Sequence, residues 1–107
     1  MNVKKALTKM QELVRDMEQQ DARERLISYS IVRTIMHELD EVAELRAIPN
    51  YAVYRHELLW SCKSICGLGD GDNHSANQHS LWASCAIDKL KSVQCFDIFN
   101  IKQKLTP

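Results

Sequence analysis

The sequence contains little glycine, little proline and few aromatic residues, and it carries no net charge. Its three glycines all lie between Gly67 and Gly71, so this segment is the only clear loop. Aromatic residues make up 7% of the 107 residues, which leaves leucine, isoleucine, valine, alanine and methionine to form a core. Fourteen basic residues balance fourteen acidic ones. A neutral chain lacks the electrostatic footprint of a protein that binds nucleic acid in bulk.

Long apolar runs are also missing from the sequence. No stretch of about 18 apolar residues occurs, so we expect no transmembrane helix. The first residues are charged, but no apolar segment follows them, which argues against a signal peptide. We therefore expect a cytoplasmic protein whose four cysteines are reduced thiols. Nothing in the sequence indicates a cofactor.

Apolar residues recur at helical spacing along most of the chain, and this periodicity predicts an all-α protein. We expect residues 1–107 to form a single domain, a small helical bundle of about four helices with a short C-terminal tail. The helices are predicted at about residues 3–19, 21–47, 51–66 and 75–94, with a loop at 67–74.

Three predicted helix ends carry capping patterns. Asp21 followed by Glu24 is a capping box, and Ser75 followed by Gln78 is a second one. Gly67 stands where a glycine commonly ends a helix in a left-handed conformation. These patterns predict helix starts at 21 and 75 and a helix end just before 67.

The first predicted helix carries an apolar seam with alternating spacings of four and three residues: Val3, Leu7, Met10, Val14 and Met17. Such a seam indicates either a helix packed inside its own domain or a homodimer in which two copies pair through this helix. Both interpretations stay open, because two heptads are fewer than a coiled coil usually needs. Residues 19–21 contain neither glycine nor proline, so one continuous helix over the first two segments is an alternative to a hairpin.

The second predicted helix carries the largest number of candidate functional residues. Its apolar stripe is predicted to be Ile31, Val32, Ile35, Leu39 and Val42. Closely spaced acids follow near its end, and we interpret them as an exposed ridge that meets a partner protein. Tyr29 and Trp82 lie off the main apolar stripes, and aromatic side chains in such positions are typical of interface anchors. The predicted protein-binding residues are therefore Glu38, Asp40, Glu41, Glu44, Tyr29 and Trp82.

Part of this acidic ridge resembles a known motif. The run Asp40-Glu41-Val42-Ala43-Glu44-Leu45 is similar to the first metal-binding helix of the MazG-like, all-α nucleotide pyrophosphohydrolases, which reads roughly Glu-Glu-x-x-Glu-Leu. The resemblance implies a Mg²⁺-dependent hydrolase of nucleoside triphosphates, with Asp40, Glu41 and Glu44 as metal ligands. The family's second motif, Glu-x-x-Asp on a following helix, is not met, because Trp60 stands three residues after Glu57.

Cysteine and histidine residues supply a second candidate metal site. Cys62-x3-Cys66 and His74-x4-His79 resemble the spacings of zinc-ligand pairs, so these four residues would be the ligands of a zinc-stapled interaction module. However, Cys62 and Cys66 fall on the apolar face of their helix, where buried cysteines are ordinary. We therefore predict no bound metal and keep zinc as an alternative.

Taken together, these patterns favour a small non-enzymatic protein that binds another protein and regulates or inhibits it. No complete catalytic set is present, and the balanced charge disfavours bulk nucleic-acid binding. A short chain with this simple helical organisation is typical of bacterial and phage accessory or counter-defence proteins. The MazG-like magnesium enzyme and the zinc-stapled module remain as alternatives.

Overall fold

The chain folds into five helices, which the computed structural model describes over residues 2–68 and 75–105, with side chains as far as Lys91. Four of the helices are long, and the third is a single short turn. In chain order they are α1 (Val3–Met17), α2 (Ala22–Leu39), α3 (Ala43–Arg46), α4 (Tyr51–Ile65) and α5 (Ala76–Leu105). The described residues contain no strand, so the predicted all-α class is confirmed.

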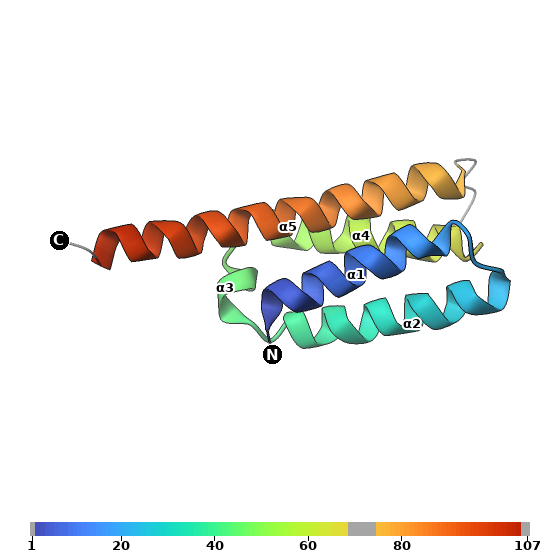
Figure 1. Cartoon of the computed structure of the whole chain (residues 1–107), viewed down its shortest axis with the longest axis horizontal. Coiled ribbons are helices and arrows are strands. Elements are labelled where there is room, and N and C mark those ends of the chain that lie inside the picture. The colour runs from blue at the N-terminus through green and yellow to red at the C-terminus, as the bar shows by residue number, and fades with distance from the viewer. Residues whose placement is uncertain (1, 69–74, 106–107) are drawn as a thin grey trace.

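The four long helices run alternately in opposite directions and form a bundle (Figure 1). α1 lies beside α2 and α5, and α4 also lies beside α2 and α5, so each long helix has two long neighbours. α3 lies at one end of the bundle, where it contacts α4 and α5. α5 projects beyond this end, and the whole molecule measures 53 × 23 × 20 Å (Figure 1).

α5 is longer than the sequence analysis predicted. The prediction ended this helix near residue 94 and added a short tail, whereas α5 continues to Leu105. The sequence from Ser75 to Leu105 contains no glycine or proline, so no residue type that breaks a helix occurs before Pro107. In the part of the chain that the structure describes, no helix combines the length with the apolar character that crossing a bilayer requires.

The apolar seam of α1 packs inside this chain. Leu7, Met10, Val14 and Met17 have no exposed surface, and Val3 is partly buried against them. α2 covers one side of the seam and α5 covers the other. The seam therefore belongs to the chain's own core, and pairing with a second copy through this seam is not the packing observed.

A turn at residues 18–21 separates α1 from α2, so the alternative of one continuous helix is wrong. The predicted capping box is present there. The backbone N–H of Glu24 donates to Asp21 Oδ1 at 2.8 Å, and the N–H of Asp21 donates to Glu24 Oε1 at 3.2 Å. Arg25 Nε also donates to the carbonyl oxygen of Met17 at 2.8 Å, which satisfies one of the acceptors left open at the end of α1.

The predicted helix over 21–47 is divided into α2 and α3, and the spacing of its last apolar residues explains why. Leu39, Val42, Leu45 and Ile48 follow one another at three-residue steps, and each step rotates a residue by roughly 60° around a regular α-helix. A tighter 3₁₀ turn keeps residues three apart on one side. The backbone follows this geometry: each N–H from Val42, Leu45 and Ile48 donates to the carbonyl three residues earlier, at 3.0–3.1 Å.

The buried face of α2 is also rotated from the predicted one. Val32 and Leu39 are buried as predicted, but Ser28 and Met36 complete the buried row, and Ile31 is 39% exposed. The observed row has spacings of four, four and three residues, which follows the helix axis closely. The predicted stripe was chosen mainly for its β-branched residues, and it therefore omitted Ser28 and Met36.

α4 ends in a Schellman motif at Gly67, as its sequence predicted. Gly67 has φ 77°, its N–H donates to the carbonyl of Ser64 at 3.0 Å, and the N–H of Leu68 donates to the carbonyl of Lys63 at 3.1 Å. At the start of α5, the N–H of Gln78 donates to Ser75 Oγ at 3.2 Å, which is one half of the predicted capping box.

Replacing Gly67 should destabilise the protein through backbone strain alone. A Cβ added at Gly67 would meet no atom within 4 Å, so Gly67→Ala adds no clash. It forces alanine into the left-handed region, and we expect a loss of about 1 kcal/mol in the free energy of unfolding. Gly67→Asn is the control, because asparagine tolerates this conformation better. Urea unfolding should rank the chains wild type, Asn, Ala, and equal losses for both variants would contradict the assignment.

Candidate functional site

The predicted acidic ridge is divided in the structure. Glu38 lies in the last turn of α2, Glu41 in the turn that follows and Glu44 on α3, and all three side chains are exposed. Asp40 is partly buried and bonds to α4 instead. What remains of the ridge is an acidic corner of three exposed carboxylates, Glu38, Glu41 and Glu44, where α2 passes into α3.

Asp40 joins the end of α2 to α4. Its carboxylate accepts hydrogen bonds from Arg55 Nε, at 2.9 Å to each oxygen, and from the Tyr51 hydroxyl at 2.5 Å. Arg55 Nη2 lies 2.8 Å from Oδ2 in an ion pair. Burial alone would raise the pKa of Asp40, but the bonds from Arg55 and Tyr51 and the charge of Arg55 outweigh it, so the pKa lies below its ordinary value. Asp40 is therefore a structural carboxylate rather than an exposed one.

The structure does not assemble the magnesium site that the resemblance implies. The motif requires its acids on one helix, but Asp40 caps the end of α2, Glu41 lies in the turn and Glu44 lies on α3. Asp40 already bonds to Arg55 and Tyr51. Within residues 2–68 and 75–91, no three His, Cys, Asp or Glu side chains form a group that could hold a metal ion.

The candidate zinc residues are also not brought together as a described group. Cys62 is fully buried in the core, and burial raises the pKa of its thiol to about 12, with a further contribution from Cys66. Cys66 donates from Sγ to the carbonyl of Arg25 at 3.4 Å. His79 lies buried on α5, and His74 lies outside the described residues. Burial therefore disfavours the thiolate form of both Cys62 and Cys66, which is the form that zinc binds.

Two tryptophans and a histidine form an aromatic cluster across α4 and α5. Trp60 on α4 and Trp82 on α5 stack with their ring centroids 6.4 Å apart and an angle of 27° between the planes. The imidazole of buried His79 meets both rings edge-on, at 5.0 Å from Trp60 and 5.2 Å from Trp82. These offset and edge-to-face arrangements are the favourable ones for aromatic pairs. The cluster therefore holds both indoles in fixed positions on the flank of the bundle.

A shallow cleft of about 300 Å³ runs along this flank, and we call its lining the tryptophan face: Glu57, Trp60, Ser61, Trp82, Cys85 and Lys89. Trp60 remains 37% exposed, and Trp82 is half-buried. The Lys89 ammonium lies 5.3 Å from the centroid of the Tyr54 ring, a cation–π contact that holds the lysine along the edge of the cleft.

Tyr29, the other predicted anchor, lies elsewhere. It is partly buried on α2, and the guanidinium of Arg33 lies over its ring at 5.7 Å from the centroid. The ring is therefore partly covered by the same helix. Of the two predicted aromatic anchors, the structure places only Trp82 on the tryptophan face.

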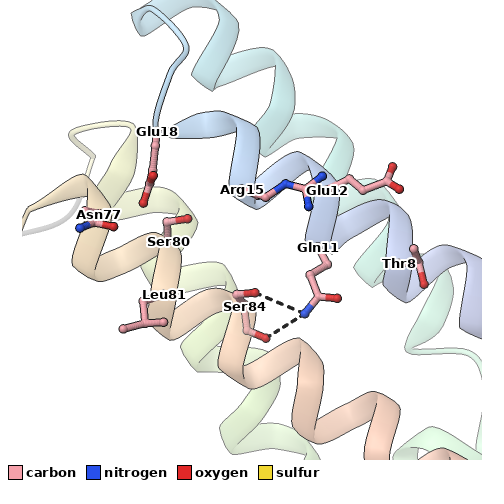
Figure 2. A pocket seen from close by; sticks show the side chains of 9 residues that line it. All are labelled: Thr8, Gln11, Glu12, Arg15, Glu18, Asn77, Ser80, Leu81 and Ser84. Carbon is pink, nitrogen blue, oxygen red and sulfur yellow. Dashed lines mark hydrogen bonds between the residues drawn. The ribbon is translucent and has the colours of Figure 1, made fainter.

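A second groove, of about 390 Å³, lies between α1 and α5 (Figure 2). Gln11 crosses it, donating from Nε2 to the carbonyl and hydroxyl oxygens of Ser84 at 3.4 and 3.3 Å (Figure 2). The same Nε2 also donates to Asp88 Oδ1 at 2.6 Å. Its lining mixes Arg15 with Glu12 and Glu18, so no single ligand charge is favoured. The hydrogen bonds of Gln11 across this groove link α1 to α5, and the residues that line it do not form a catalytic set.

Sequence reasoning missed three residues of these arrangements. Arg55 is fifteen positions from Asp40 and on another helix, so no local pattern connects the pair. Trp60 is not among the predicted binding residues, and His79 is considered only as an alternative zinc ligand. A prediction that placed α4 beside α5 would have brought these three aromatic rings together.

Comparison with known proteins gave no match: no protein-family model, no curated protein and no solved structure is significantly similar to the chain.

The Asp40 pair predicts a pH-dependent contribution to stability. Because the pKa of Asp40 is lowered by folding, its contribution is present above the unfolded-state pKa of about 4 and is lost as pH falls through the folded-state pKa. Asp40→Asn should lower the free energy of unfolding by about 1–2 kcal/mol at pH 7, with the loss shrinking below pH 4. Urea unfolding at pH 7 and pH 3 measures both values.

Glu41→Gln is the matched control for this prediction. It removes a neighbouring carboxylate that is exposed, and it should change stability by less than about 0.5 kcal/mol at either pH. If Asp40→Asn is as neutral as Glu41→Gln at pH 7, the structural role of Asp40 is refuted.

Proposed function

We propose that the protein binds another protein through the tryptophan face, and that it regulates or inhibits this partner in the cytoplasm. The observation that carries the proposal is the stacked pair Trp60 and Trp82, which two neighbouring helices hold rigidly while leaving indole surface in contact with solvent. Tryptophan is among the residues that most often dominate binding energy at protein interfaces.

The surroundings of the pair support a protein partner. Charged side chains, Glu57 and Lys89, line the cleft together with the indoles, which matches the mixture of apolar centre and polar rim found at interfaces. Val53 lies seven residues before Trp60 on the same side of α4 and is 51% exposed, so it extends the apolar surface. The backbone beneath is helical, so little conformational entropy is lost when a partner binds.

The acidic corner has a second part in this proposal. Glu38, Glu41 and Glu44 are exposed and have no ion pair within the described residues, so no described basic side chain neutralises their negative charges. Such charges accelerate the approach of a basic partner more than they hold it in place.

Removing either indole should release the partner. The immobilised full-length chain would be used to capture proteins from the cells that make it, and the partner would then be purified for affinity measurements. Trp60→Ala and Trp82→Ala should each weaken its binding at least tenfold, because truncating an anchor at an interface commonly costs about 2 kcal/mol or more. Circular dichroism of each variant checks that the helices remain.

Leu81→Ala is the matched control for the indole variants. Leu81 is 56% exposed and adjoins Trp82 in sequence, but it lines the groove between α1 and α5. Its replacement should leave affinity within twofold. A partner that binds both tryptophan variants as tightly as the wild type would refute the proposed face. If the partner is a second copy of this chain, sedimentation would show a dimer that Trp60→Ala dissociates.

Charge reversal at the acidic corner should act differently from removal of an indole. The triple variant Glu38→Lys, Glu41→Lys, Glu44→Lys should slow association several-fold at low salt and change the dissociation rate little, because exposed charges act over distances that salt screens. Surface plasmon resonance at two ionic strengths separates the two rates. An unchanged association rate at low salt would remove the acidic corner from the encounter.

A further inference from the structure

The flank of α4 opposite the tryptophan face borders a larger surface cavity, wide open to solvent and of about 570 Å³, between α2 and α4. Its lining is Ser30, Arg33, Thr34 and His37 from α2, and Arg55 and Leu59 from α4. Arg33, Thr34 and His37 follow Ser30 by three, four and seven positions, so the four α2 residues form one row along the helix. Among adjacent pairs of long helices, α2 and α4 are the least closely packed, which leaves this space open.

The lining of this cavity consists mainly of hydrogen-bond donors. Five of the six side chains carry N–H or O–H groups, three of them can carry positive charge, and none is a carboxylate. Thr34 Oγ1 already donates to the carbonyl of Ser30 at 3.0 Å. The donors that remain for a ligand come from Ser30, Arg33, His37 and Arg55.

The two guanidiniums are held on opposite walls. Arg33 lies over the Tyr29 ring and forms no ion pair with any described carboxylate. Arg55 is fixed by Asp40, which uses its Nε–H and one hydrogen on Nη2. A guanidinium has five N–H groups, so three of those on Arg55 remain available. With two positive charges and one negative charge from Asp40, the site keeps one net positive charge before His37 is counted.

We propose that this cavity binds the phosphate group of a small phosphomonoester. Donors from two walls surround the space, and a tetrahedral phosphate offers acceptors in several directions, whereas a planar carboxylate is satisfied by one guanidinium. The cavity is much larger than a phosphate ion, so it leaves room for the rest of a small organic molecule beside the phosphate. Leu59 supplies the apolar surface against which the rest of the ligand lies.

Titration of the ¹⁵N-labelled full-length chain tests this site. Glucose 6-phosphate should shift the backbone amides of Ser30, Arg33 and Arg55 saturably, and inorganic phosphate should shift the same amides with lower affinity. Glucose and sodium acetate, at matched ionic strength, should not. Acetate that binds as tightly as phosphate, or shifts that never saturate, would overturn the proposal.

Two variants locate the binding. Arg33→Gln should weaken glucose 6-phosphate binding at least tenfold, because it removes the guanidinium that has no carboxylate partner in the described structure. Arg23→Gln, an exposed arginine outside the cavity on the same helix, should leave binding within twofold. Equal losses from both variants would reduce the effect to general charge attraction and overturn the site. Circular dichroism confirms that each variant is folded.

Discussion

Burial of the apolar stripe of α1 is the constraint on which the rest of the bundle depends. Leu7, Met10, Val14 and Met17 are wholly removed from water, and each such side chain contributes about 1.5–3 kcal/mol relative to exposure. A hairpin of α1 and α2 would cover only one side of this stripe. The other side is covered when α5 returns along α1, where Ser80 Oγ donates to the carbonyl of Val14 at 3.2 Å. The first and last helices therefore have to meet for the core to close.

The size of the side chains between helices decides where functional surface is left over. Ala83 and Ala86 are fully buried on α5, and these small residues allow α4 to approach closely. A closely packed pair leaves no room for an indole between the axes, so Trp60 and Trp82 lie on the flank and stack there. Between α2 and α4 the packing is sparser, and a polar cavity remains.

The sequence predicted what depends on local periodicity and capping, and it failed where tertiary contacts decide. The α1 seam, the Asp21 capping box and the Gly67 helix end follow from residue types at fixed spacing, and all are present. Asp40 looked like one acid of a ridge, because nothing local identifies Arg55 as its partner. Likewise, His79 looked like a ligand by its spacing, whereas its position on α5 buries it beneath two indoles.

The position of α4 against α2 shows how a cavity persists in so small a bundle. At one end Arg55 and Tyr51 of α4 bond to Asp40. At the other end, Arg25 of α2 donates from Nη1 to the carbonyl of Ile65 at 3.3 Å, and Cys66 bonds to the Arg25 carbonyl. These polar contacts fix both ends of the pair, and the row from Ser30 to His37 lies between them. Arg33 is exposed and forms no ion pair with a described carboxylate, so closing α2 onto α4 along this row would take its guanidinium out of solvent without a counter-ion. That desolvation is unfavourable, so the charged lining favours the open geometry.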